Sequence, residues 1–155
     1  MPTTFKSTTY TNQSGGLVRN RIDATVLSGD RRVAELEYKF LGTEASGDFI
    51  QFGQMPPGVA IYADEIKLLS EGIGGTTVTL TALGDQQTIN RYSTTAIPLT
   101  AAINSASITP AVATTVPPVT ITAGINDVIQ GTLGGTLPAT ANKRIWLRVP
   151  YRMTS

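Results

Sequence analysis

The sequence predicts an all-β protein, folded as a β-sandwich or barrel with an extended Thr/Ala/Pro-rich segment. Threonine, a β-branched residue that favours strands, occurs 24 times among the 155 residues. The 15 glycines and 9 prolines are spread along the chain, where they mark turns. Apolar and polar residues alternate in several short runs between these turns. Many short strands joined by turns are typical of a sandwich or barrel.

Three runs show the alternation most clearly. Residues 33–41 predict a strand, although Glu, Leu, Lys and Ala also favour helices. Residues 76–83 and 144–152 follow the same pattern, but Pro150 has no N–H for a ladder and indicates an edge strand or a strand end. The side chains expected to face the core are Ala34, Leu36, Tyr38, Phe40, Val78, Leu80, Ala82, Ile145, Leu147, Val149 and Tyr151. Further strand-like runs begin at residue 58 and lie near 5–10, 17–27, 48–53, 118–122 and 127–133.

The length fits a single domain spanning residues 1–155. Within it, residues 92–142 are largely uncharged, because Asp127 is the one charged side chain there. Isoleucine and valine recur too often in this stretch for a plain linker. We expect it to be partly extended toward a partner subunit. A monomer that exposed so much apolar surface would be unusual, so a homo-oligomer is expected.

The composition excludes several kinds of chemistry. The chain has no cysteine and no histidine, which removes thiolate nucleophiles, disulfides and the usual general base near neutral pH. A net charge of +1 gives no overall attraction to nucleic acid. No apolar run approaches the roughly 18 residues of a membrane span, and residues 1–6 lack the apolar core of a signal peptide. We therefore expect a soluble, non-enzymatic protein made in a cytoplasm.

No catalytic, cofactor-binding or metal site is predicted. Glu35 and Glu37 share a strand face at a Cα separation of about 6.6 Å, which overlaps the range used by glycoside hydrolases. Lys39 beside them indicates an ordinary solvated face instead. Asp64 and Glu65 are adjacent and suit a turn. The glycine clusters at 72–75 and 131–135 lack the lysine of a phosphate loop, and no calcium-loop motif occurs.

Two arginine groups are candidates for surface interactions. Arg144, Trp146, Arg148 and Arg152 are expected on the outer face of the last strand. Arginine and tryptophan are enriched at interaction hot spots and attract each other by cation–π contact. This face is either a basic solvent-exposed surface, a docking surface for a partner subunit or acidic shell, or a platform for stacking sugars or bases. The second group, Arg19, Arg21, Arg31 and Arg32, brackets Asp23 and Asp30 and predicts surface ion pairs.

One segment carries a more specific pattern. Met55-Pro56-Pro57-Gly58 forms a turn before the strand Val59-Ala60-Ile61, a glycine loop follows at 72–75, and the threonine-rich run 76–83 ends in Gly84-Asp85. Ile89 to Tyr92 also fit. Residues 54–85 thereby resemble a segment of small structural proteins of tailed-bacteriophage virions. The resemblance implies a jelly-roll-like sandwich.

The role that best matches this resemblance is that of a capsid decoration (cement) protein, and a neck or tail component is the alternative. It implies a homotrimer whose partners are the major capsid protein or other virion proteins, with no direct nucleic-acid or membrane partner and no cofactor. The expected location is the virion, assembled in the host cytoplasm. A carbohydrate-binding module is a third possibility, for which Trp146 and a few tyrosines would have to line a groove.

Overall fold

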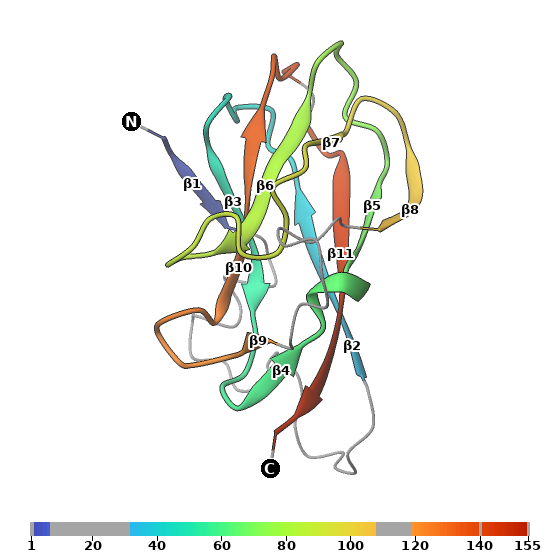
Figure 1. Ribbon diagram of the computed structural model, residues 1–155. Coiled ribbons are helices and arrows are strands. Elements are labelled where there is room, and N and C mark those ends of the chain that lie inside the picture. Colours follow the sequence, from blue (N-terminus) through green and yellow to red (C-terminus); the bar gives the residue numbers. More distant parts are fainter. Residues whose placement is uncertain (1, 7–31, 108–118, 140, 155) are drawn as a thin grey trace.

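The computed structural model describes residues 2–6, 32–107, 119–139 and 141–154, which form two β-sheets (Figure 1). Sheet A has the strand order β1 (Thr4–Lys6), β3 (Phe49–Gln54), β10 (Val128–Gly134), β6 (Thr79–Asp85) and β7 (Ile97–Pro98). Its pairs are antiparallel except β1 with β3, which run parallel. The all-β class and the two-sheet sandwich are thus confirmed.

Sheet B is arranged around its longest strand, β11 (Arg144–Met153). One edge of β11 pairs with β2 (Arg32–Lys39) along the whole of that strand. The other edge pairs first with β5 (Lys67–Ser70) and then with β4 (Val59–Ile61). Strands β8 (Ile103–Ser107) and β9 (Val119–Thr120) complete the sheet beside β5 and β4. A single 3-10 turn, η2 (Ala63–Glu65), separates β4 from β5.

Pro150 lies within the central strand of sheet B, so the prediction of an edge strand or strand end was wrong. The carbonyl oxygen of Pro150 accepts a hydrogen bond from the backbone N–H of Tyr62 at 3.0 Å. In an antiparallel strand, the nitrogen and carbonyl of one residue point to the same side. The nitrogen of Pro150 therefore faces the place where β11 changes partner from β5 to β4. No strand-to-strand hydrogen bond is lost there, because no described strand pairs with Pro150 on that side.

The core lies between the sheets and contains nearly all of the side chains predicted for it. Alternate residues of β2 and β11 are buried, and Tyr38 of sheet B packs edge-on to Phe52 of sheet A with ring centroids 6.4 Å apart. The prediction was wrong at one position. Ala82, which was predicted to face the core, is only half-buried and points outward, and the neighbouring Leu83 is buried instead, at 1% exposed. The register of β6 against β10 shifts by one residue at Thr81. This bulge reverses the alternation beyond it.

The uncharged stretch 92–142 contributes to both sheets. Strands β7, β8, β9 and β10 all come from it, and β10 lies in the middle of sheet A between β3 and β6. The portion at 108–118 lies outside the described residues, as do the strand-like run at 17–27 and the basic cluster from Arg19 to Arg31. The contact of this stretch with a partner subunit stays a prediction.

Candidate partner-binding face

The outer surface of β2, β11 and β5 over the three cross-strand rows from Arg144 to Arg148 is called the sheet B face. Burial alternates along β11, so that Arg144, Trp146 and Arg148 point away from the core, as the sequence predicted. The strand register places Glu37 and Leu69 on either side of Trp146, and Glu35 and Lys67 on either side of Arg148. The members of the face are Glu35, Glu37, Lys39, Lys67, Leu69, Glu71, Arg144, Trp146 and Arg148.

Glutamates neutralise the arginines of this face. Arg148 Nε lies 3.1 Å from Glu35 Oε2, and Arg144 Nε lies 3.5 Å from Glu37 Oε1. These pairs are about half exposed, so each contributes little to stability. Their effect is on the charge of the surface. Sequence reasoning left open a basic face, but the structure shows one on which three glutamates lie among four cations.

Trp146 is held at the centre of the face. Its Nε1 donates a hydrogen bond to Glu37 Oε2 at 3.1 Å, while the ring remains partly exposed. This hydrogen bond restricts the orientation of the indole, which would lower the entropy lost if a partner bound there. Glu35 and Glu37, weighed from the sequence as an acid pair, instead bind Arg148, Arg144 and Trp146.

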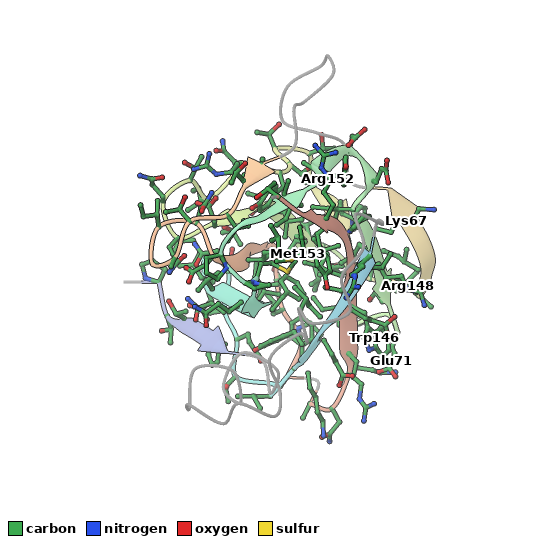
Figure 2. All side chains as sticks on the ribbon, turned by 90° about the horizontal axis from the view of Figure 1, so that it is seen from below. Lys67, Glu71, Trp146, Arg148, Arg152 and Met153 are labelled. Carbon is green, nitrogen blue, oxygen red and sulfur yellow. The ribbon has the colours of Figure 1, made fainter. Side chains whose placement is uncertain are left out.

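Arg152 stands apart from the other three predicted residues. It follows Pro150 on β11 and pairs with Ala60 of β4 rather than with β5. Its guanidinium carbon lies 5.8 Å from the ring centroid of Tyr62, in a cation–π contact. Figure 2 shows Lys67, Glu71, Trp146 and Arg148 together on one side of the molecule, with Arg152 away from them. The structure thus brings together Arg144, Trp146 and Arg148 only.

Sequence reasoning missed a buried carboxylate in the loop after β2. Glu44 accepts hydrogen bonds from the Tyr38 hydroxyl at 2.6 Å and from the backbone N–H groups of Leu41, Gly42 and Thr43 at 2.7, 2.8 and 3.0 Å. Burial, followed by the hydrogen bond to Glu44, raises the pKa of Tyr38 above its ordinary value. Four donors satisfy this carboxylate, so it organises the loop and has no capacity left for catalysis.

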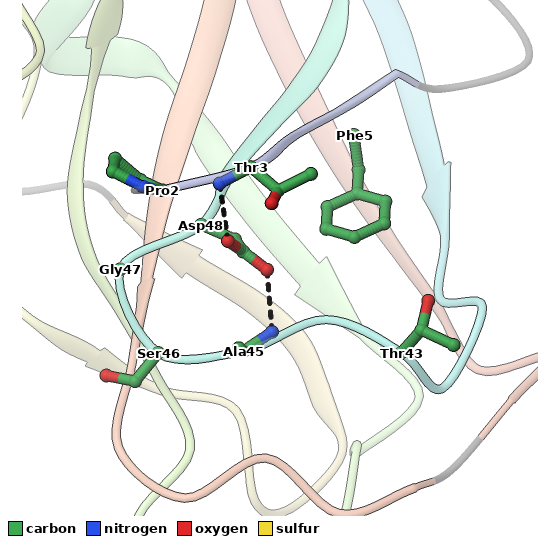
Figure 3. A pocket seen from close by; sticks show the side chains of 8 residues that line it. All are labelled: Pro2, Thr3, Phe5, Thr43, Ala45, Ser46, Gly47 and Asp48. Carbon is green, nitrogen blue, oxygen red and sulfur yellow. Dashed lines mark hydrogen bonds between the residues drawn. The ribbon is translucent and has the colours of Figure 1, made fainter.

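A pocket of about 440 Å³ opens beside this loop and β1 (Figure 3). Asp48 at its wall accepts hydrogen bonds from the backbone N–H groups of Thr3 and Ala45, both at 2.7 Å. Its carboxylate therefore ties the segment before β1 to the loop. The lining residues are Pro2, Thr3, Phe5, Thr43, Ala45, Ser46, Gly47 and Asp48.

Two further buried carboxylates lie near one end of sheet A. Asp85 accepts hydrogen bonds from the N–H groups of Gln87 and Thr88 at 3.0 and 2.8 Å and forms an ion pair with Arg91. Asp127 Oδ2 accepts a hydrogen bond from the Gln54 side chain at 2.5 Å.

Among the described residues, no three acidic side chains form a group that could hold a metal ion. No helix within the same ranges is long and apolar enough to cross a membrane.

These interactions link residues that are far apart in the chain. Glu35 and Arg148 are separated by 113 positions, and Trp146 and Glu37 by 109. A single sequence carries no signal of such pairing until the strand order is known. The signal that was available is the alternation itself, since it placed Glu35 and Glu37 on one face of β2 and Arg144, Trp146 and Arg148 on one face of β11.

Comparisons with known proteins give two similar folds. A chain of the cyanophage Pam1 capsid asymmetric unit superposes with a TM-score of 0.60 at 23% identity, over 86% of this chain and 93% of that one. A chain of the capsid of Ralstonia phage GP4 has a TM-score of 0.59 at 17% identity, over 98% and 99%. No family model and no curated protein matches the sequence. The chain therefore has the fold of a chain found in each of these two capsid structures.

Proposed function

We propose that the protein is a structural component of a tailed-phage virion, and that it decorates the head shell as a cement protein. The observation that carries this is the match over nearly the full length of both chains to a protein in the GP4 capsid structure. The described carboxylates support a non-catalytic role, because Glu44, Asp48 and Asp85 each bind two or more backbone N–H groups.

A cement protein acts by adding interface area across boundaries between shell subunits. This requires a rigid body and a contact surface that loses little freedom on binding. The two-sheet core supplies the rigidity. The sheet B face supplies a contact surface toward a neighbouring subunit of the decorated shell, with Trp146 at its centre and Arg144 and Arg148 beside it.

Binding to shells that lack their decoration tests this role. Wild-type protein should saturate at a fixed copy number per shell and raise the temperature at which DNA is released. Truncating a buried aromatic anchor costs about 2–4 kcal/mol, or roughly 30- to 1,000-fold in affinity, although avidity would mask part of the loss. Trp146→Ala should therefore be retained far less well. Ile89→Ala, which removes a side chain 46% exposed in the loop after β6 of sheet A, is the control.

Two results would change the proposal. If wild-type protein ignores shells but assembles rings or joins tails, it is a neck or tail component. If Trp146→Ala binds and stabilises shells as well as wild type does, the decoration role stands and the sheet B face is not the contact surface.

A further inference from the structure

The four corner charges of the sheet B face alternate in sign. Glu35 and Lys39 lie on β2, and Lys67 and Glu71 lie on and just after β5. Glu35 and Lys67 flank Arg148 in one cross-strand row. The second row lies on the other side of Trp146 and is centred on Arg144. Lys39 is the cross-strand partner of Arg144 on β2, and on the β5 side Glu71 Oε2 accepts a hydrogen bond from the Arg144 backbone N–H at 2.8 Å. The corners are therefore negative and positive in the first row, and positive and negative in the second.

Such a pattern is its own complement under a two-fold rotation. If the axis lies across the strands, Glu35 of one copy meets Lys39 of the other, and Lys67 meets Glu71. If the axis lies along the strands, Glu35 meets Lys67, and Lys39 meets Glu71. Either rotation brings four opposite-charge pairs together, which is the symmetry of an isologous contact.

The middle of the face suits the same contact. Trp146 and Leu69 are cross-strand partners and both are partly exposed, so they form an apolar centre between the charged rows. Glu37 completes this middle row beside Trp146 and would meet Leu69 of the second copy for an axis along the strands, and Glu37 for an axis across them. Either axis can pass close to Trp146, which would place the two indoles near each other. Arg144 and Arg148 approach their counterparts in the second copy, but Glu37 and Glu35 already neutralise them.

We propose that the sheet B face binds a second copy of this chain through a two-fold contact. An acidic partner is disfavoured, because three carboxylates lie among the four cations of the face. The inference rests on the proposed function and narrows it: on the shell the sheet B face would join neighbouring copies, and the contact with the shell itself would use another surface of the chain. The self-contact itself can be measured without shells.

The size of the face sets the expected affinity. Three strands about 4.8 Å apart, each about five residues long over the face with three of them facing outward, cover a patch roughly 15 Å on a side. Such a patch buries well under the ~800 Å² per partner of a standard stable interface. The contact is therefore weak for free protein and becomes effective when many copies are held at high local concentration.

Cross-linking provides the test, because the chain has no cysteine of its own. Leu69→Cys places one thiol at the centre of the face, and a short bismaleimide should yield a covalent dimer that increases with protein concentration. Ile125→Cys, at a loop residue 46% exposed and distant in the fold from β5, is the matched control and should give no such dimer. Equal products from both variants would overturn the proposal.

Charge exchange in the Leu69→Cys background distinguishes a specific contact from random collision of two copies. The first double variant exchanges the two charges of β5 (Lys67→Glu with Glu71→Lys). Like charges of the two copies then face each other if the axis lies along the strands, but not if it lies across them. Exchanging the charges of the second row (Lys39→Glu with Glu71→Lys) opposes like charges for an axis across the strands only, and it leaves the Glu35–Arg148 ion pair in place. One of the two double variants should give at least about fivefold less dimer, and exchanging all four charges should restore it. If neither double variant loses dimer, the proposal fails.

Shells distinguish this inference from the proposed function. If Leu69→Cys dimerises alone but does not bind shells, the decoration role fails and the self-contact stands. If it is cross-linked only when shells are present, and then to a shell protein, the occupant of the face is the shell protein and the self-contact is excluded.

Discussion

The buried carboxylates show how single residues decide the loops of this fold. Glu44, Asp48 and Asp85 are each less than a tenth exposed, and each accepts two or more backbone N–H groups. A buried charge is tolerated only when hydrogen bonds replace its hydration. Hydrogen bonds to these carboxylates therefore take the place of strand-to-strand hydrogen bonds where the backbone turns.

Replacing Glu44 by glutamine tests this account. The amide keeps the size of the side chain but loses its charge, and its NH₂ group cannot accept the N–H bonds that the carboxylate accepts. Hydrogen bonds to a charged group are worth about 1.5–3 kcal/mol, so Glu44→Gln should lower the free energy of unfolding in urea by at least that amount. Glu35→Gln, which alters a carboxylate whose side chain is 55% exposed, should change it by under about 1 kcal/mol. Equal losses would contradict the account.

Two buried tyrosines predict how stability depends on alkaline pH. Burial raises the pKa of Tyr38 and of Tyr92, so both phenols stay protonated in the folded protein when the unfolded chain begins to ionise near pH ~10. The folded state then holds more protons than the unfolded state, and the free energy of unfolding must fall as the pH rises above about 10.

Tyr92→Phe should reduce this dependence. Within the described residues the Tyr92 hydroxyl is buried without a hydrogen-bond partner, so its removal should change stability at pH 7 very little. Above about pH 10, the fall in the free energy of unfolding should become less steep by up to ~1.4 kcal/mol per pH unit. Urea unfolding at a series of pH values measures both quantities, and an unchanged slope would refute the assignment.

At the level of elements, the sequence predicted the features that depend on the two-residue alternation of side chains along a strand. It placed the core residues of β2 and β11 correctly, because the side chains of a strand alternate without exception unless a bulge intervenes. The bulge at Thr81 and the position of Pro150 in a central strand escaped prediction, since both depend on which strand lies opposite. For the same reason the sequence placed Glu35 and Glu37 on one outer strand face and Arg144, Trp146 and Arg148 on another, but did not predict that the two strands are neighbours.

Gly84 tests how β6 and the loop after it fit together. A Cβ atom on Gly84 would lie 2.1 Å from the backbone oxygen of Thr88, so the loop would have to move. Gly84→Ala should cost about 1–3 kcal/mol or more, as overpacking does, and should also disturb Asp85 next to it. At Gly124 an added Cβ meets nothing within 4 Å, so Gly124→Ala should cost only the strain of its positive φ, about 1 kcal/mol. Thermal or urea unfolding compares the two.

At the scale of the whole molecule, the uncharged stretch 92–142 predicts self-association. Light scattering of the purified protein at micromolar concentration should find a symmetric homo-oligomer, with the trimer expected before the dimer. This association is independent of the weak two-fold contact proposed for the sheet B face, so Trp146→Ala should leave it intact. A stable monomer at that concentration would contradict the assignment of 92–142 to an interface.

The most direct test of the proposed role is a reconstruction of shells incubated with the purified protein. Electron cryomicroscopy of undecorated shells before and after addition should show new density on the outer surface, at symmetry-related positions and of a size that fits the two sheets. Occupancy should saturate at a fixed number of copies. Shells unchanged after addition of excess folded protein, or density confined to the neck or tail of complete particles, would contradict the claim that this chain is a decoration protein of the head.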